Sequence, residues 1–182
     1  YLSDIPIQCA IDVKRKQFSN TIVDGDGFIF LNDFQKEVYD SFNNTRLLSI
    51  SAPTSAGKSF VLLQMIKEHI SSHPFAKIAY IVPTRALIQQ VELDIRAIIK
   101  KNNLAADISS IPIKPDTWDK KASVMVFTQE RLQWLISEFP DMVFDFIIVD
   151  EAQKISDGSR GILLQQVLQQ VATKNETRFI FA

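Results

Sequence analysis

The sequence predicts an α/β domain whose mainly parallel sheet is covered by helices. Short apolar runs alternate with longer segments whose apolar residues recur at helical spacing, which is the rhythm of repeated βα units. The prolines from residue 53 to residue 140 all fall between these segments. Because 46% of the 182 residues are hydrophobic, the chain has enough apolar material for one core.

Six apolar runs are the expected strands, and four amphipathic segments are the expected helices. Along residues 85–101, for example, Leu87, Val91, Ile95 and Ile98 recur at helical spacing. In such sheets the functional loops follow the carboxyl ends of the strands. The expected strands are Leu47–Ser51, Ile78–Val82, Ala106–Ser110, Val124–Phe127, Phe146–Val149 and Arg178–Phe181. The expected helices are Lys58–Ser71, Arg85–Lys101, Gln129–Phe139 and Arg160–Thr173.

Residues 1–33 are predicted to be an N-terminal extension that contains a hairpin. Two apolar runs, Ile22-Val23 and residues 28–31, flank Asp24-Gly25-Asp26-Gly27, which has the composition of a turn. The turn does not fit a calcium loop, because Ile29 stands where that loop needs glycine.

Composition narrows the class of protein. A formal charge of −1 and a pI near 6.2 argue against a domain that holds nucleic acid by a large basic surface. No apolar run approaches the roughly 18 residues of a membrane span, so we expect no membrane partner. The single cysteine, Cys9, suits a reducing compartment, and we expect an intracellular, cytoplasmic protein.

A phosphate-binding loop is indicated at residues 51–59, Ser-Ala-Pro-Thr-Ser-Ala-Gly-Lys-Ser, between an expected strand and an expected helix. Lys58 would reach the β and γ phosphates of ATP, and the Ser59 hydroxyl would ligate Mg²⁺. Ala52 stands where the consensus has glycine, so a chance Gly-Lys-Ser turn is the alternative. The nucleotide would also face the loop and the first helical turn at Thr54, Ser55, Ala56, Gly57 and Phe60.

Two adjacent carboxylates, Asp150 and Glu151, end the apolar run at residues 146–149. In a phosphate-loop enzyme Asp150 would hold Mg²⁺ through its water shell, and Glu151 would polarise the attacking water. The alternative is a helix N-cap at Asp150.

The tetrapeptide Asp150-Glu151-Ala152-Gln153 resembles the second motif of the superfamily 2 DEAD/DExH-box helicases, and the resemblance extends from Phe34 to the end of the chain. It implies the first RecA-like domain of such a helicase, a three-layer α/β/α sandwich with a P-loop, ATP and Mg²⁺ as cofactors, and ATP hydrolysis by Lys58 and Glu151. Gln153 would belong to the nucleotide site, although the superkiller-type DExH branch, which the pair Arg160-Gly161 resembles, has histidine there.

Asn32–Gln35 resembles the segment in which a helicase glutamine pairs with adenine, so the resemblance assigns Gln35 to the base. The alternative is a surface glutamine at the start of a helix. Its apolar face would consist of Phe34, Val38, Tyr39 and Phe42.

Two further segments resemble motifs Ia and Ib of the family, which contact the backbone of a single strand of RNA or DNA without reading sequence. They are residues 82–87, followed by two glutamines, and residues 126–132. The resemblance assigns this contact to Pro83, Thr84, Arg85, Gln89, Thr128 and Gln129.

The chain stops where the family's Ser-Ala-Thr motif III would come. We therefore expect a fragment that lacks the second RecA-like domain of the full-length chain and turns over ATP slowly or not at all. Two alternatives remain open: another P-loop phosphotransferase, or a catalytically silent, ATP-gated interaction module, motivated by Ala52 and Gln153. Of the two tryptophans, Trp134 is expected to pack against the domain, and Trp118 is also expected not to be exposed.

Overall fold

The computed structural model describes residues 7–24, 27–42, 44–53, 56–114, 118, 120–155, 159–174 and 176–182. Its body is a six-stranded sheet in which every neighbouring pair of strands is parallel, in the order β3-β8-β7-β4-β6-β5. The α/β class with a mainly parallel sheet is thereby confirmed. The strands are β3 (Leu47–Ser49), β4 (Lys77–Ile81), β5 (Ala106–Ser109), β6 (Ala122–Phe127), β7 (Phe146–Val149) and β8 (Arg178–Phe181).

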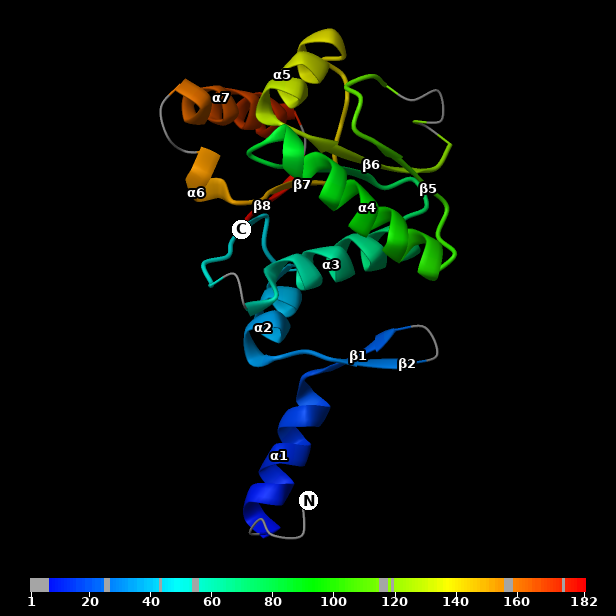
Figure 1. Ribbon diagram of the computed structural model, residues 1–182, viewed down its shortest axis with the longest axis vertical. Helices are drawn as coiled ribbons and strands as arrows, with labels where there is room; N and C mark the ends of the chain where they lie inside the picture. The colour runs from blue at the N-terminus through cyan, green and yellow to red at the C-terminus, as the bar shows by residue number, and fades with distance from the viewer. Residues whose placement is uncertain are drawn as a thin grey trace.

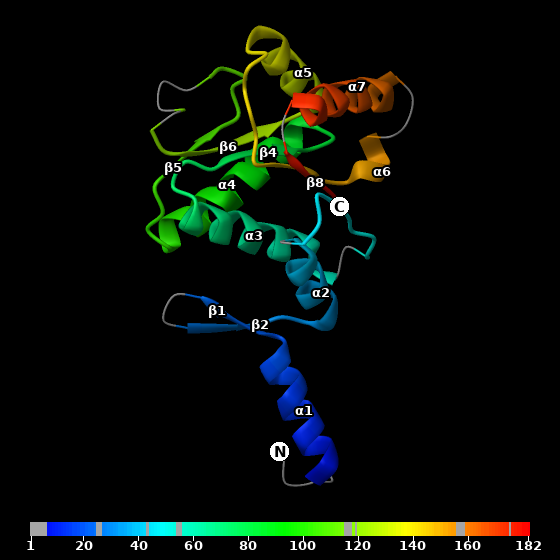
Figure 2. The ribbon, with the colours of Figure 1, turned by 180° about the vertical axis from the view of Figure 1, so that it is seen from behind.

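Helices cover both faces of this sheet and complete a three-layer sandwich (Figures 1 and 2). Side chains alternate along each strand, so that Ile78 and Tyr80 of β4 join one core, while Ala79 and Ile81 join the other. The first core is closed by α2 (Asp33–Phe42), α3 (Lys58–Ser72) and α4 (Arg85–Lys101). The second core is closed by α5 (Gln129–Glu138) and α7 (Ser159–Lys174), with the short α6 (Ala152–Ile155) following β7.

The predicted apolar face of α4 is partly wrong. The helix buries Ile88, Ile95 and Ile99 against the sheet, whereas Leu87 is 37% exposed. Val91 and Ile98 are partly buried and pack against the same core, and Leu87 and Val91 also line a cavity beside Asp150. The apolar periodicity predicted the helix correctly but not which of its residues are most buried, because some apolar residues face the cavity and not the core.

The two tryptophans differ from each other. Trp118 is buried, as expected, with its ring edge-on to Phe144 and the Lys77 ammonium 4.9 Å from its centroid. Trp134 on α5 is 47% exposed, so the expectation that it packs into the domain is wrong. Leu132, Leu135 and Ile136 supply the buried face of that helix.

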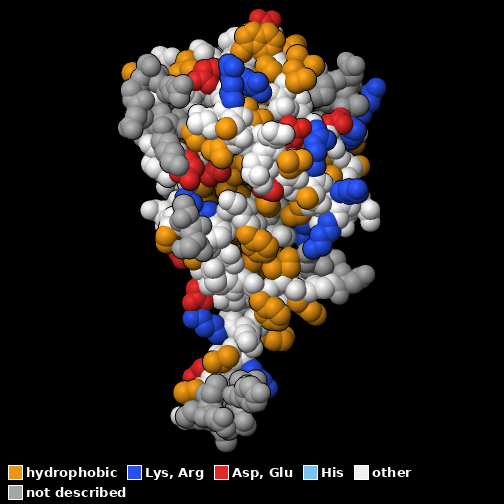
Figure 3. Space-filling model, viewed as in Figure 1, with side chains coloured by type: hydrophobic (Ala, Val, Ile, Leu, Met, Phe, Trp, Pro, Cys, Tyr) orange, Lys and Arg blue, Asp and Glu red, His pale blue; other side chains and the backbone are white. Residues whose placement is uncertain are grey.

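The N-terminal residues lie outside the sandwich. Helix α1 (Ile7–Ser19), which the sequence did not suggest, extends away from the sheet and its helices (Figures 1 and 2). Strands β1 (Thr21–Asp24) and β2 (Gly27–Phe30) form an antiparallel pair at the two runs that flank the predicted turn. Hydrophobic side chains are exposed on this part of the surface (Figure 3), among them Phe18, Val23, Phe28 and Phe30.

At the amino ends of β4 and β7, a polar cluster joins the sheet to α2 and α3. Asp145 precedes β7, accepts the backbone N–H of Lys77 and lies 3.9 Å from the His69 imidazole. Arg178 lies with its guanidinium 4.3 Å from the Phe42 ring centroid and donates to the Phe42 carbonyl. We call Asp145, His69 and Arg178 the amino-edge cluster.

Within the described residues, no helix has the length and apolar character needed to span a bilayer. On the face shown in Figure 3, Lys and Arg side chains are scattered among acidic ones and do not gather into one basic surface.

Candidate nucleotide-binding site

The predicted phosphate-binding loop connects β3 to α3 at the carboxyl edge of the sheet. The Ile50 N–H donates to the Phe181 carbonyl at 2.7 Å and fixes the start of the loop. Gly57 is the N-cap of α3 with φ +79°, a conformation that favours glycine. A Cβ on Gly57 would also overlap the side-chain nitrogen of Gln35. The loop places Lys58 and Ser59 as the first two residues of α3; Thr54 and Ser55 lie outside the described residues.

Gln35 and Asn32 tie the start of α2 to this loop. The Asn32 side chain accepts the Gln35 backbone N–H at 2.8 Å, and the Gln35 side chain accepts the Asn32 backbone N–H at 3.1 Å, a reciprocal cap. Both side-chain amides also donate to the carbonyl of Ala56 at 3.3 Å. Both ends of the Gln35 carboxamide are therefore bonded within the protein, at the base of the phosphate loop.

The paired carboxylates follow β7 directly. Asp150 Oδ2 accepts the Tyr80 hydroxyl at 2.8 Å, and Asp150 Oδ1 accepts the Glu151 N–H at 3.0 Å. Glu151 has φ +52°, which is uncommon for a residue other than glycine and marks a sharp turn at the strand end. Gln153 donates its side-chain amide to Glu151 Oε2 at 2.8 Å.

Electrostatics distinguish Asp150 from an ordinary surface aspartate. Burial raises the pKa of Asp150, and the nearby Glu151 adds to the rise, while the Tyr80 hydroxyl, the Glu151 N–H and the Lys58 ammonium oppose it. Burial, followed by the charge of Asp150, raises the pKa of Tyr80 well above its usual value, so the phenol stays a donor. The carboxylate thus lies in a partly desolvated place that favours a bound cation.

One cavity of about 210 Å³ brings the central predicted residues together. Lys58, Ser59, Asp150 and Glu151 line it, and Tyr80 and Asp94 complete its polar wall. Neither Gln35 nor Gln153 lines it, and Phe60, 40% exposed, lines a neighbouring cavity under β2. Sequence reasoning missed Tyr80 and Asp94; a tyrosine within the apolar run at residues 78–82 was the available signal.

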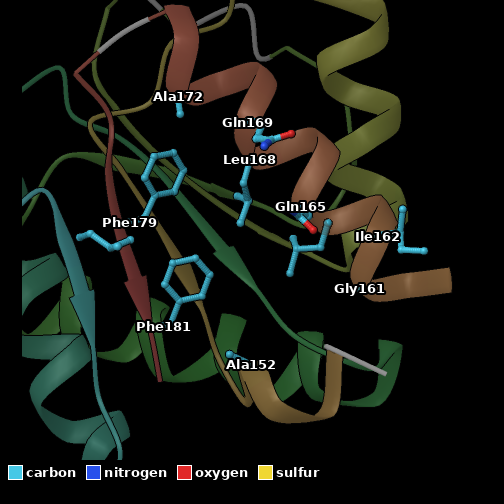
Figure 4. A pocket seen from close by; sticks show the side chains of 11 residues that line it. Ala152, Gly161, Ile162, Gln165, Leu168, Gln169, Ala172, Phe179 and Phe181 are labelled. Atoms are coloured by element: carbon cyan, nitrogen blue, oxygen red, sulfur yellow. The ribbon is translucent and has the colours of Figure 1, made fainter. Parts of the chain in front are cut away.

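A larger apolar groove of about 600 Å³ lies elsewhere, between α7 and the sheet (Figure 4). Phe179 and Phe181 project from β8 toward Leu168 of α7. The groove holds none of the charged groups at the carboxyl edge of the sheet, so its size does not make it the site of the chemistry.

The side chains at the cavity fit a magnesium ion carried by a nucleotide. A serine hydroxyl and two carboxylates are hard oxygen donors, and Mg²⁺ in such sites combines one or two of them with phosphate oxygens and water. Among the residues that the structure describes, no group of three or more His, Cys, Asp or Glu side chains forms a complete metal site.

The segments that resemble motifs Ia and Ib lie side by side at the same edge. The Val82 N–H donates to the Phe127 carbonyl at 2.8 Å, which joins the ends of β4 and β6. Thr84, Arg85 and Gln89 are exposed at the start of α4, and Pro83 is half-buried. At the start of α5, by contrast, Thr128 is 5% and Gln129 1% exposed, so the structure does not place these two residues on the surface.

The loop before α3, the paired carboxylates after β7 and the exposed start of α4 agree with comparison to known proteins. The family model described as DEAD/DEAH box helicase matches residues 32–182. The chain belongs to this family. It is 27% identical over 140 residues to the antiviral helicase SKI2 of Saccharomyces cerevisiae. The matched segment covers 76% of the chain and 10% of SKI2.

The chain also matches only part of the length of two other helicases. The chain is 27% identical over 154 residues to the ATP-dependent DNA helicase Hel308 of Thermoplasma volcanium, covering 82% of the chain and 22% of that protein. The crystal structure of a hypothetical ATP-dependent RNA helicase from Sulfolobus tokodaii has a TM-score of 0.62 at 22% identity, covering 86% of the chain and 47% of that structure. The resemblance to superfamily 2 helicases and the RecA-like fold are confirmed, and the chain spans only 10% and 22% of the lengths of SKI2 and Hel308.

Proposed function

We propose that residues 34–182 are the ATP-binding domain of a nucleic-acid-dependent ATPase that unwinds or moves along RNA or DNA. The observation that carries this proposal is the convergence of Lys58, Ser59, Asp150 and Glu151 on one cavity of about 210 Å³. These residues come from two loops at the carboxyl edge of one parallel sheet, where α/β proteins bind nucleotides. The DEAD/DEAH box family favours this function over a phosphotransferase.

Each of the four residues has a distinct task in the proposed reaction. Lys58 is only 9% exposed and begins α3. Its ammonium would neutralise the negative charge of the phosphates, together with the first N–H groups of that helix. Ser59 and Asp150 would hold Mg²⁺, which when bound neutralises charge on the phosphates; Asp150 acts through a water molecule. Glu151 would orient and polarise the attacking water. Gln35 would contact adenine through the second N–H and the second lone pair of its carboxamide, since one of each is bonded within the protein.

The nucleic acid would bind at the exposed start of α4, beside the start of α5. Arg85 supplies the charge, while Thr84 and Gln89 supply neutral donors, with Thr128 and Gln129 shaping the start of α5. Contacts of this kind reach phosphates and sugars and carry no sequence information. A second RecA-like domain would supply the groups that complete hydrolysis.

Calorimetric titration tests the nucleotide site directly. The 182-residue chain should bind a non-hydrolysable Mg-ATP analogue, and Lys58→Ala should abolish that binding while its thermal unfolding stays close to that of the wild type. Lys67→Ala is the matched control on the same helix, 8% exposed and further along α3. Failure of the wild type to bind would overturn the proposed site.

Binding of a labelled single strand tests the second half of the proposal. Because Arg85 is exposed at the carboxyl edge, Arg85→Ala should weaken binding of RNA or DNA by about tenfold and reduce the salt dependence by about one phosphate contact. Lys100→Ala, at the far end of the same helix, should leave the affinity unchanged. Equal losses from the two variants would mean that net charge, and not the α4 start, determines binding.

A second candidate is an ATP-gated module that binds nucleotide without turnover. It is favoured by the Gln153 amide, which occupies Glu151 Oε2 and thereby competes with a water molecule for the proposed base. Introducing the histidine of the superkiller-type DExH branch tests it: a protein carrying Gln153→His together with the second RecA-like domain would gain turnover only under this candidate.

A further inference from the structure

We propose that Tyr80 is a positioning residue for Asp150, fixing its carboxylate in the orientation in which it holds Mg²⁺. This inference rests on the proposed function of Asp150 as a metal-holding group. Tyr80 itself would touch neither the nucleotide nor the reacting water; it acts through the hydrogen bond to Asp150 Oδ2.

The sheet register makes this contact possible. Tyr80 lies opposite Ile148 in the β4–β7 pair, and Asp150 follows two residues later on the same face. The phenol therefore points toward the carboxyl edge and reaches the carboxylate diagonally across the two strands, ending at 2.8 Å from Oδ2. The Asp150 N–H is also bonded to β4, at the Ile81 carbonyl, at 2.9 Å. Backbone and side chain of Asp150 are thus attached to the same strand.

Both carboxylate oxygens are engaged, one by each neighbour. Oδ2 accepts the phenol and Oδ1 accepts the Glu151 N–H at 3.0 Å. Rotation about the Cβ–Cγ bond would break both hydrogen bonds, so the plane of the carboxylate is fixed. Each oxygen keeps a further lone pair for the water shell of a cation.

Burial explains why the hydroxyl needs this partner. Tyr80 is 2% exposed and packs in the core with Ile78 and Ile148, where phenylalanine would fill nearly the same space. A buried hydroxyl without a partner is unfavourable. Within the part of the chain that the structure describes, Tyr80 is the one side chain with a recorded hydrogen bond to Asp150. The hydroxyl therefore serves Asp150, while the ring serves the core.

The test is a Mg²⁺ titration of nucleotide binding by the 182-residue chain. The concentration of Mg²⁺ that gives half-maximal binding of a non-hydrolysable ATP analogue should rise about tenfold in Tyr80→Phe, because a hydrogen bond to a charged group is lost. Binding of the analogue in excess EDTA should be unchanged, and saturating Mg²⁺ should restore the wild-type affinity. These two results separate positioning of Asp150 from general damage to the site.

Tyr39→Phe is the matched control. It removes the same hydroxyl, and the Tyr39 hydroxyl also donates to a carboxylate, that of Glu68, but on the outside of α2 and α3. Its Mg²⁺ dependence should equal that of the wild type. In an Asp150→Asn background, Tyr80→Phe should cause no additional shift, because the two changes remove one interaction.

The outcomes are distinguishable. A wild type and a Tyr80→Phe variant with the same Mg²⁺ dependence would overturn the role of Tyr80 and leave the proposed function intact. Equal losses in EDTA and in Mg²⁺ would assign Tyr80 to packing alone and overturn it as well. Absence of nucleotide binding by the wild type would overturn the proposed function and the role of Tyr80 together.

Discussion

Strand β7 has an aspartate at each end, and the two carboxylates are in opposite situations. Asp145 precedes the strand and belongs to the amino-edge cluster; Asp150 follows it and lines the cavity proposed to bind the nucleotide. The pKa of Asp145 lies below its usual value, whereas the pKa of Asp150 lies above it. The two residues share strand neighbours β4 and β8, so the difference arises from the groups around each carboxylate.

Compensation accounts for the difference. Burial opposes ionisation of both residues, but at Asp145 the His69 imidazole and the Lys77 N–H outweigh it, with further help from the charge of His73. At Asp150 burial prevails over the Tyr80 hydroxyl, the Glu151 N–H and Lys58. A carboxylate whose burial is offset by hydrogen bonds and positive charges stabilises the fold. A carboxylate whose burial is not fully offset lowers the free energy of unfolding and is suited to bind a cation. The pair separates a structural from a functional aspartate on one strand.

The largest effect should follow from Asp150→Asn. In a protein that includes the second RecA-like domain, ATP turnover should fall by about 100-fold or more, because a charge placed for the transition state is lost. The free energy of unfolding of the 182-residue chain should stay equal or rise by up to about 1 kcal/mol, since the amide does not need to be ionised in a partly buried place. Turnover assays and urea unfolding measure the two quantities. Retained ATP turnover, or a clear fall in the free energy of unfolding, would contradict the proposed difference between Asp150 and Asp145.

Asp145→Asn should show the reverse pattern. The free energy of unfolding should fall by about 1 kcal/mol, a value reduced for the 39% exposure of this side chain. Binding of the Mg-ATP analogue should stay within about twofold of the wild type, because the amino edge lies at the other end of the strand from the cavity. Urea unfolding and calorimetry test this pair of results. A drop in nucleotide affinity as large as that in stability would show that the two ends of β7 are coupled.

Acid should remove the contribution of Asp145 selectively. Because its folded-state pKa is depressed, the folded state binds this proton less readily than the unfolded chain does. The contribution is thus fully present above the unfolded pKa of about 3.9 and disappears as the pH falls through the lower folded value. His69, His73, Lys77 and Arg178 face the carboxylate. The stability difference between wild type and Asp145→Asn should shrink from about 1 kcal/mol at pH 7 toward zero near pH 2. A difference that is constant with pH would point to packing.

The sequence predicted the sandwich well because its signals are local. Residues 146–149 form β7 as expected, and the predicted helix at residues 85–101 matches α4 at both ends. Local patterns also identified Lys58, Ser59, Asp150 and Glu151, which the structure brings to one cavity. Helix α1 escaped prediction because it packs on no core, so its apolar residues have no buried stripe to reveal it; Phe18, for example, is 88% exposed.

Contacts between distant residues were out of reach of the same reasoning. The bond from Tyr80 to Asp150 spans 70 positions and depends on the pairing of β4 with β7, which periodicity does not specify. The opposite states of Asp145 and Asp150 likewise come from partners on other elements. The burial of Thr128 and Gln129, and the exposure of Trp134, depend on how α5 lies against its neighbours. The sequence therefore predicted which residues belong to the candidate site, while the contacts of each residue follow only from the tertiary structure.

The smallest effect should come from Arg178→Lys, which separates charge from stacking in the amino-edge cluster. Arg178 lies 4.3 Å from the Phe42 ring centroid and donates to the Phe42 carbonyl, and its charge also acts on Asp145. Lysine keeps the charge but lacks the planar guanidinium, so the free energy of unfolding should fall by about 0.5 kcal/mol. The acid dependence caused by Asp145 should persist, because the groups that lower its pKa, His69, the Lys77 N–H and His73, are unchanged. Arg96→Lys, at an exposed pair with Glu92 on α4, is the matched control and should change stability less. If Arg178→Lys instead removed the acid dependence, the guanidinium would be needed to hold His69, 3.4 Å away, in place beside Asp145.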